Sequence, residues 1–474
     1  MSVQATPGYN LQPSAEQVAL STNYITNFDF LNQYLPDTYE KEFERYGNRT
    51  VSSFLRMVGA EMPSNSDLIK WAEQGRLHIK YVDCTTTVLT NADTATFTIN
   101  DTLSPGTGGI AVRVGQTIMI SPRVFNTAGA TATSNKAIVT AVDTTAGTVA
   151  VAFYEANGMS STAAYTEFEL FIYGSEFKKG TTGMEGSLEA DDEIFENSPI
   201  ILKDKYAVSG SDMAQIGWVE VTTENGASGY LWYLKSEHET RLRFDDYLET
   251  SMIEAVPAAV GSGAAAATGN VGNKGSEGVF YTVENRGNVW QGANPSSLQN
   301  FDSIVSRLDK QGAIEENVLF LDRDFGFDID DMLASQNSYG ANGTSYGLFD
   351  NDKDMALNLG FTGFRRGYDF YKSDWKYLND PTMRGGLVNG KINGLLVPAG
   401  STTVYDQILG KNAKRPFLHV RYRASETEDR RYKTWMTGSA GGASNSDLDA
   451  MEVNFLSERA VCTLGANNFF LFKS

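Results

Sequence analysis

The feature that most constrains the fold is an abrupt change of composition between residues 84 and 165. Threonine, alanine and valine dominate this stretch, and only about seven of its residues carry charge. Short runs of alternating apolar and polar residues recur in it, separated by Gly and Pro, which is typical of β-strands joined by tight turns. We therefore predict a small all-β module inserted into another domain. The predicted strands are residues 94–99, 110–114, 117–120, 136–142 and 148–154, with a hairpin turn at 144–147.

The clearest helical pattern covers residues 231–256, which Pro257 ends. A helix of about 26 residues would be roughly 40 Å long, longer than the average globular helix. We expect it to act as a spine for the surrounding structure. Its apolar stripe recurs every four residues, at Phe244, Leu248, Met252 and Val256.

The segments around this helix predict extended structure. Residues 1–75 have the pattern of an arm with short helices, one at 39–58 and one at 68–74 that contains Trp71. Residues 199–208 and 216–221 alternate in polarity, which suits a long two-stranded excursion that needs a neighbour to lie on.

The C-terminal half predicts a packed layer of helices and strands, so the fold class is α+β. Ser296 or Ser297 begins a helix that Gly312 closes, and a further helical turn begins at Asp328. Residues 337–380 are rich in aromatic residues, Gly, Asn and Asp, and are predicted to be irregular. Strands are predicted at 317–321, 394–397, 417–423 and 461–472.

Charge and cysteine content limit the classes of partner. The chain carries 39 basic and 58 acidic residues, a formal charge of −19, so it would repel DNA. The local basic pairs Arg365–Arg366 and Arg430–Arg431 are expected to be salt-bridged or solvated. Cys84 and Cys462 are the only cysteines, which indicates a reducing compartment, although one bridge is conceivable. Residues 1–17 lack the features of a signal peptide, and no apolar run is long enough to span a membrane.

No pattern of catalytic residues emerges. The histidines, His78, His238 and His419, are far apart, and neither cysteine has a positioned histidine nearby. The glycine-rich run at 269–276 lacks the Gly-Lys-Ser/Thr ending of a phosphate-binding loop. The sequence therefore predicts no enzyme, no catalytic or cofactor-binding residues and no cofactor.

Two segments rich in acidic residues are candidates for metal binding. Asp350, Asp352 and Asp354 have the spacing of the first ligands of a calcium loop, but Met355 and Phe361 replace its Gly and Glu. The calcium motif fails and no metal site is predicted, while incidental cation binding near this loop stays open. The second segment is dense in aspartates, of which Asp328, Asp330 and Asp331 are predicted to favour a helix N-terminus. Its members are Asp322, Asp324, Asp328, Asp330 and Asp331.

Three segments resemble the HK97-like major capsid proteins of tailed phages. They are residues 197–211, the helix end at 248–255 and the C-terminal 459–470. Residues 34–71 and 379–382 are similar to crAss-like phage capsid proteins in particular. The resemblance implies an HK97-like capsid fold with an N-terminal arm, an extended β-hairpin loop, a long spine helix and axial and peripheral domains. The implied divisions are the arm at 1–83, the inserted module at 84–165, the extended loop at 166–230, the spine helix and peripheral elements at 231–335, and the axial domain with terminal strands at 336–474.

The resemblance also implies a function. The chain would assemble in the host bacterial cytoplasm into the icosahedral capsid of a virion, with itself in hexamers and pentamers as main partner. Scaffolding, portal and auxiliary capsid proteins are further implied partners, packaged double-stranded DNA would be near only non-specifically, and no membrane is involved. Some members cross-link through Lys–Asn bonds, but no motif assigns such a bond to Lys178 or Lys179. The alternatives are an encapsulin-type compartment, a phage tail or adhesion component, and a carbohydrate-active enzyme.

Overall fold

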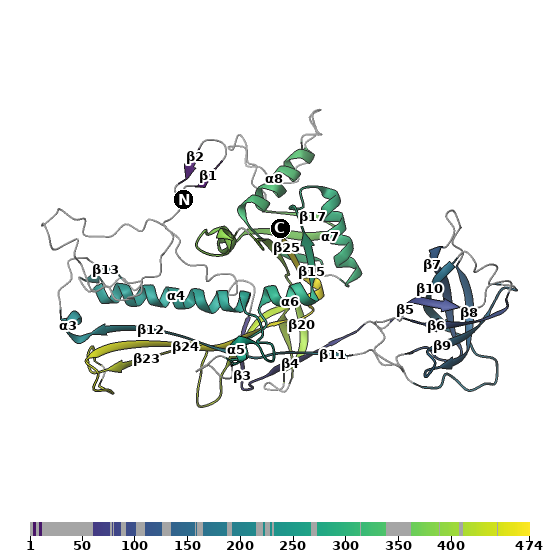
Figure 1. The fold of residues 1–474 in the computed structure, drawn as a ribbon, viewed down its shortest axis with the longest axis horizontal. Helices are drawn as coiled ribbons and strands as arrows, with labels where there is room; N and C mark the ends of the chain where they lie inside the picture. The colour runs from purple at the N-terminus through teal and green to yellow at the C-terminus, as the bar shows by residue number, and fades with distance from the viewer. Residues whose placement is uncertain are drawn as a thin grey trace. The chain divides into compact units, whose positions relative to one another are not determined.

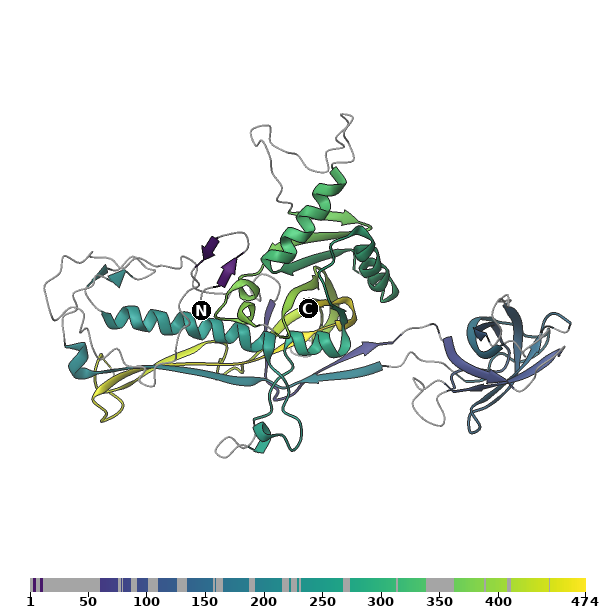
Figure 2. The same ribbon diagram turned by 45° about the horizontal axis from the view of Figure 1, so that its top comes forward.

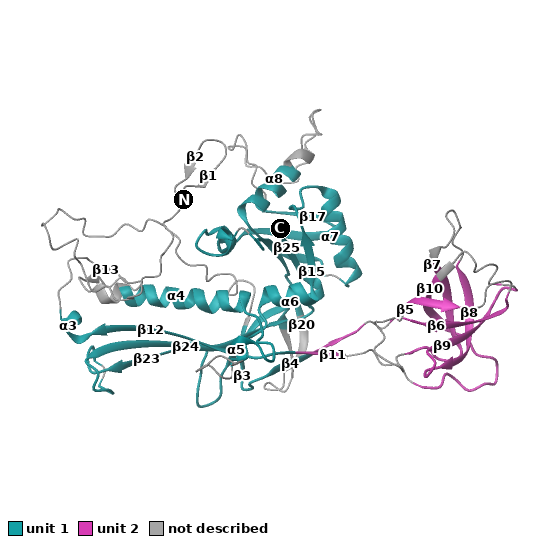
Figure 3. Ribbon diagram, viewed as in Figure 1, with its two compact units in different colours: residues 1–71, 196–474 teal, residues 72–195 magenta. Residues whose placement is uncertain are grey.

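The computed structural model divides the chain into two compact units. Unit 1 comprises residues 1–71 and 196–474, and unit 2 comprises residues 72–195 (Figure 3). Helices and strands alternate in unit 1, whereas unit 2 is built of strands (Figure 1), so the fold class is α+β as predicted. The structure describes residues 3–5, 9–11, 60–75, 78, 80–86, 92–100, 110–125, 134–156, 158, 165–186, 192–214, 221–222, 228–229, 232–266, 273–312, 314–337, 362–387, 389–406, 411–442 and 444–474.

Unit 2 contains a closed barrel whose strands are ordered β10-β5-β6-β9-β8-β7. Alternate side chains point inward, and Phe97 meets Phe168 edge-on at 5.5 Å between ring centroids inside the barrel. Closure leaves no open edge for pairing with other chains. The strands are β5 (Lys80–Thr86), β6 (Thr94–Ile99), β7 (Gln116–Phe125), β8 (Asn135–Asp143), β9 (Thr148–Phe153) and β10 (Tyr165–Ser175).

Most of the predicted strands in this stretch are present. The predicted hairpin turn joins β8 to β9, with Gly147 at φ +69° and the Asp143 carboxylate accepting hydrogen bonds from two turn amides. Residues 110–114 were predicted as a strand and are not one. Ile110 and Val112 are nevertheless buried in the barrel core, so their alternation reflects burial without strand pairing. The compact unit is wider than residues 84–165 because β5 begins earlier and β10 ends later.

A sheet of long strands forms one part of unit 1 (Figures 1 and 2). Its order is β12-β24-β22-β3, and β23 also pairs with β24. The ladder between β12 and β24 runs for ten residue pairs, from Ile200↔Arg459 to Ser209↔Ala450. The strands are β3 (Ala60–Ser64), β12 (Ile200–Ser209), β22 (Leu418–Arg423), β23 (Lys433–Gly438) and β24 (Ala450–Thr463).

The predicted spine is α4 (Trp232–Glu254), a helix of 23 residues that packs on this sheet. Phe244 and Leu248 are buried against Val208 and other apolar residues of β12 and β24. The stripe ends earlier than predicted. Val256 lies beyond the last helical turn and is 58 % exposed, because the chain leaves the helix before Pro257.

A second, six-stranded sheet carries helices on both faces. The order is β15-β25-β19-β16-β18-β17. Leu319 and Leu321 of β16 face helices α7 and α8, while Phe320 between them faces α6 and the end of α4. The strands are β15 (Asn288–Gln291), β16 (Glu316–Leu321), β17 (Gly363–Arg366), β18 (Tyr368–Asp374), β19 (Ile392–Pro398) and β25 (Phe470–Lys473), and the helices are α6 (Val279–Arg286), α7 (Leu298–Lys310) and α8 (Arg323–Asn337).

The starts of α7 and α8 are both capped by side chains. Ser297 accepts a hydrogen bond from the amide of Asn300, as predicted, and Gly312 follows the helix end at φ +82°. Helix α8 starts at Arg323, ahead of the predicted start at Asp328. Asp322 is the capping residue there, because its carboxylate accepts from the amide of Phe325 at 2.8 Å.

Four further predictions about secondary structure are wrong. Residues 68–74 form strand β4 (Ile69–Gln74), since burial alternates with a period of two along it. Residues 363–374, predicted as irregular, form β17 and β18. The predicted strand 461–472 is two strands in different sheets, because Gly465 turns the chain at φ +59°. Residues 199–208 pair with β24 in a five-stranded sheet, which differs from the predicted two-stranded excursion, and residues 216–220 of its other predicted strand lie outside the described residues.

The other described elements are short. The chain passes between the two units through β4 and β11 (Asp192–Asn197), which pair as a two-stranded ribbon. The predicted helix at 39–58 and the calcium-like loop at 350–361 lie outside the described residues. The short elements are β1 (Val3–Ala5), β2 (Tyr9–Leu11), α3 (Gly210–Met213), β13 (Val221–Thr222), β14 (Ser228–Gly229), α5 (Gly263–Ala266), α9 (Lys376–Asn379), η2 (Arg384–Gly386), β20 (Ser401–Asp406), β21 (Lys411–Pro416) and η3 (Ala466–Asn468).

Candidate functional site

The histidines lie in different parts of the fold. His78 is exposed in unit 2, His238 is half-buried on α4, and His419 is buried on β22. His419 stands directly opposite Cys462 on β24. The structure thus brings a histidine to a cysteine, which corrects the prediction that neither cysteine has a histidine nearby.

The protonation states of this Cys–His pair do not favour nucleophilic catalysis by the thiol. Burial lowers the pKa of His419 to about 4, and its Nδ1 lies 3.2 Å from the carbonyl oxygen of Pro416, to which it donates. Burial raises the pKa of Cys462 to about 12. A nucleophilic cysteine needs a thiolate, usually beside an imidazolium. Here both groups are neutral near pH 7, and the second cysteine, Cys84, is also buried and forms no disulfide.

The aspartate-rich segment serves the packing of α8. Asp322 pairs with the ammonium of Lys391 at 2.9 Å besides capping the helix. Asp330 pairs with Lys372 at 2.5 Å, and Asp328 accepts a hydrogen bond from Asn294 at 2.8 Å. Among the described residues, no group of three or more His, Cys, Asp or Glu side chains could hold a metal ion.

The two basic pairs are neutralised, as predicted. Arg366 makes two hydrogen bonds to the carboxylate of Asp302, and Arg365 pairs with Asp369 at 3.2 Å. Arg430 lies 2.7 Å from Glu458 in the other pair. Arg431 there pairs with Glu61 of β3.

Asn197 forms a buried polar junction where β11 turns into β12. Its side-chain nitrogen donates to the carbonyl oxygens of Glu277 at 3.0 Å and Val461 at 2.7 Å. Its side-chain oxygen accepts from the hydroxyl of Ser276 at 3.0 Å and from the amides of Glu277 and Ser198 at 2.9 and 2.8 Å. Asn197 is 3 % exposed, so every one of its hydrogen-bonding positions is used inside the protein.

The junction anchors the base of the β4–β11 ribbon. Ile69 of β4 is buried against Ala460 and Cys462 of the long-stranded sheet. On the ribbon itself, Lys70 pairs with Glu196 at 3.0 Å. The base of the ribbon therefore has both apolar and polar attachments to unit 1.

Apolar side chains remain exposed on the ribbon and on the long strands. Ile194 of β11 is 66 % exposed, Ile201 of β12 52 %, and Trp435 of β23 37 %. Strand pairing places Ile201 and Trp435 on the face of the sheet opposite the one that packs on α4. No described residue of the chain covers these side chains enough to bury them.

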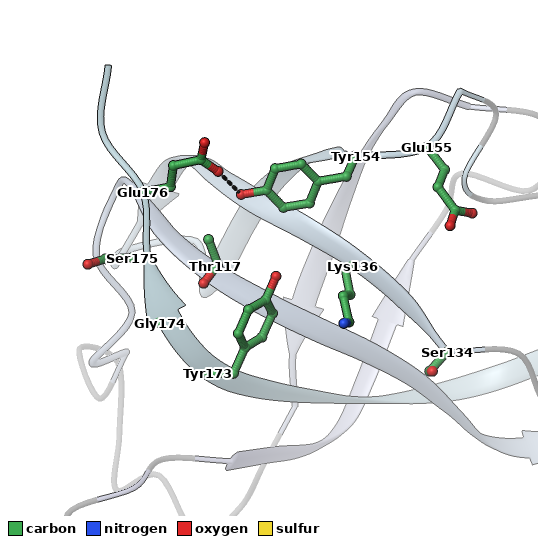
Figure 4. A pocket seen from close by; sticks show the side chains of 9 residues that line it. All are labelled: Thr117, Ser134, Lys136, Tyr154, Glu155, Tyr173, Gly174, Ser175 and Glu176. Carbon is green, nitrogen blue, oxygen red and sulfur yellow. Dashed lines mark hydrogen bonds between the residues drawn. The ribbon is translucent and has the colours of Figure 1, made fainter. Parts of the chain in front are cut away.

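A hollow of roughly 730 Å³ lies on the outside of the barrel (Figure 4). The hydroxyl of Tyr154 donates to the carboxylate of Glu176 at 2.5 Å, and the ammonium of Lys136 lies 5.7 Å from the ring centroid of Tyr173. Partial burial and the Glu176 carboxylate raise the pKa of Tyr154 to about 12. The hollow is lined by Thr117, Ser134, Lys136, Tyr154, Glu155, Tyr173, Gly174, Ser175 and Glu176.

Neither the junction nor the hollow is predicted by the sequence patterns. Asn197 stands in one of the segments that carry the resemblance, but its partners are about 80 and 264 positions away and cannot be read from the sequence. A signal for the hollow was present in β10. Phe168 and Leu170 point into the barrel, and side chains alternate between the two faces of a strand. Tyr173, which lies an odd number of positions from both, therefore points outward.

Each helix that the structure describes is too short or too polar to cross a membrane.

No protein-family model matches the sequence, and neither does any curated protein. Several solved structures contain chains that are similar to this one. A chain of Mycobacterium phage Ogopogo is 11 % identical with a TM-score of 0.38, covering 93 % of this chain and 96 % of that one. A chain of Microbacterium phage Oxtober96 is 10 % identical with a TM-score of 0.37, covering 92 % and 95 %. A chain from the capsid of a native GTA particle is 8 % identical with a TM-score of 0.36, covering 95 % and 99 %. These scores are too low to carry an argument about this chain.

Proposed function

We propose that this protein is a structural shell subunit, a major capsid protein that assembles with copies of itself into an icosahedral container for a double-stranded DNA genome. The observation that carries the proposal is the long-stranded sheet with its ribbon, whose apolar side chains stay exposed in the single chain. A two-stranded ribbon is marginally stable alone, so it gains stability by packing on another surface. Neighbouring copies would supply that surface, and closed symmetry would repeat each contact around the shell.

The resemblance of residues 197–211, 248–255 and 459–470 to HK97-like capsid proteins supports the same proposal. On this reading the partners are other copies in hexamers and pentamers, with scaffolding, portal and auxiliary capsid proteins. The crAss-like subgroup and assembly in a bacterial host are part of the proposal. The barrel would act as a decoration or contact module on the shell.

The net negative charge of the chain is compatible with a container inside which the nucleic acid must be able to move. With a formal charge of −19, the protein repels phosphates, so a genome packed against it would slide instead of adhering. Because all four arginines of the two basic pairs form salt bridges, neither pair makes a strong basic patch. Tight DNA binding by the unassembled protein would contradict this part of the proposal.

The test is expression of the full chain, followed by negative-stain electron microscopy and analytical ultracentrifugation. Closed shells are expected from the natural sequence. Ile201→Asp places a charge on the exposed sheet face and is expected to leave subunits unassembled, whereas Ile201→Leu retains an apolar side chain and should still assemble. A stable monomer or trimer from the natural sequence would overturn the proposal and favour the tail or adhesion alternative.

The encapsulin-type alternative predicts the same shells with a different content. Extraction of particles from their native source distinguishes the two, because a genome container holds long DNA and a cargo compartment holds protein. Removal of residues 1–60 is expected to leave a subunit that does not assemble, whereas removal of the whole barrel, residues 80–175, should leave shells intact. Normal particles from the first deletion would show that the arm is not needed.

A further inference from the structure

We propose that the hollow on the barrel binds a neutral saccharide. The side chains that carry this inference are Tyr154 and Tyr173, which are 49 % and 47 % exposed although both are large and aromatic. Figure 4 shows both rings at the hollow, with Lys136 beside Tyr173 and with Glu155 and Ser134 toward the other end. The proposal goes beyond the shell function and does not depend on it.

Both rings are held in place before any ligand arrives. The hydrogen bond from Tyr154 to Glu176 fixes one ring, and the ammonium of Lys136 over the face of Tyr173 fixes the other. Glu176 is itself anchored, since its amide donates to the carbonyl oxygen of Gly115 at 2.9 Å. A tyrosine fixed in this way offers a broad contact surface and loses little conformational entropy on binding.

The chemistry of the lining selects the class of ligand. A sugar ring presents C–H groups on its faces, which pack on the partly negative face of an aromatic ring, and hydroxyl groups around its edge. Two carboxylates, those of Glu155 and Glu176, can accept hydrogen bonds from such hydroxyls, and Lys136 and Ser134 can donate them. An apolar ligand would leave these groups unpaired, which costs binding energy.

The volume of the hollow and the charge of its lining limit the kind of saccharide that can bind. The volume of roughly 730 Å³ falls within the range of about 300–1,000 Å³ that small-molecule sites occupy. One ammonium and two carboxylates leave the lining with an excess of negative charge. A uronate or other acidic sugar would be repelled, so a neutral oligosaccharide fits best.

The test uses the full-length protein and isothermal titration calorimetry against cellohexaose, maltohexaose and chitohexaose. Binding of at least one is expected, and Tyr173→Ala should weaken it roughly tenfold or more. The matched control is Tyr371→Ala, which removes a tyrosine that is 53 % exposed on unit 1 and should leave binding unchanged. Glu155→Gln is a second variant at the hollow that preserves size, and it should also weaken binding.

Three results would overturn the proposal. One is no heat with any of the three oligosaccharides at millimolar concentration. Another is binding that Tyr173→Ala and Glu155→Gln leave unchanged, since the sugar would then lie elsewhere. The third is tighter binding of a polygalacturonate oligomer than of every neutral one. A proline-rich peptide bound at these tyrosines, with no sugar bound, would assign the hollow to peptide recognition instead.

Discussion

Replacement of Asn197 by alanine should destabilise unit 1 far more than the loss of one polar side chain normally does. The change removes five hydrogen bonds from a residue that is 3 % exposed. It leaves the hydroxyl of Ser276 and the carbonyl oxygen of Val461 without this partner, and both residues are 1 % exposed. A buried polar group without a partner costs about 1–3 kcal/mol. Two such groups, with some relaxation of the loop, give a loss of about 3 kcal/mol.

Tryptophan fluorescence can measure this loss in unit 1 selectively. All six tryptophans of the chain lie outside residues 72–195, so the barrel does not contribute to their signal. With a urea dependence of about 3 kcal/mol per molar, the midpoint of unfolding should fall by about 1 M.

The matched control is Asn454→Ala, which removes one side-chain hydrogen bond of 3.1 Å to Thr437 from a half-buried position on β24. Its midpoint should fall by no more than about 0.3 M, because a single hydrogen bond contributes about 1 kcal/mol. Equal shifts for the two variants would refute the reasoning, since the junction would then contribute no more than an ordinary polar contact.

Three further predictions concern His419, the two cysteines and Gly465. Burial holds the pKa of His419 at about 4, so its contribution to stability is fully present above pH 6.5 and is lost as the pH falls toward 4. The difference between 6.5 and about 4, at about 1.4 kcal/mol per pKa unit, makes this contribution about 3 kcal/mol. His419→Gln should therefore flatten the fall of the urea midpoint over this pH window, and an unchanged slope would contradict the prediction. Burial raises the pKa of Cys462 from 9.0 to about 12, so the urea midpoint should fall as the pH rises above 9. Both cysteines are buried, so neither Cys462 nor Cys84 should react with a thiol reagent at pH 7.5 until urea unfolds the protein. Gly465→Ala should lower stability by about 1 kcal/mol in the same titration, because φ is +59° there, and a gain in stability would argue against this conformation.

Local patterns were sufficient where burial follows the period of a single element. The predicted strand 94–99 coincides with β6, and the predicted helix 231–256 differs from α4 by a few residues at its ends. The capping serine of α7 was also recognisable, since Ser297 accepts its hydrogen bond from a residue three positions away. Each of these features depends on neighbours in the sequence.

Features that depend on distant partners were not predictable from one sequence. Residues 69–74 contain good helix formers, yet Ile69 is held as a strand by contacts with Ala460 and Cys462. The partner of β12 is β24, about 250 positions away, so the local alternation could not say what it pairs with. The same sheet register creates the Cys–His pair, whose two members are also far apart in the sequence.

The ribbon of β4 and β11 has a practical consequence. The chain leaves unit 1 along one strand of this ribbon and returns along the other, so the two ends of unit 2, at residues 72 and 195, lie on neighbouring hydrogen-bonded strands. A guest domain whose own termini lie close together could be spliced in at the same place without stretching the host polypeptide. Fluorescent reporters or antigens with adjacent termini are therefore natural replacements for the barrel, with every copy of the host displaying one.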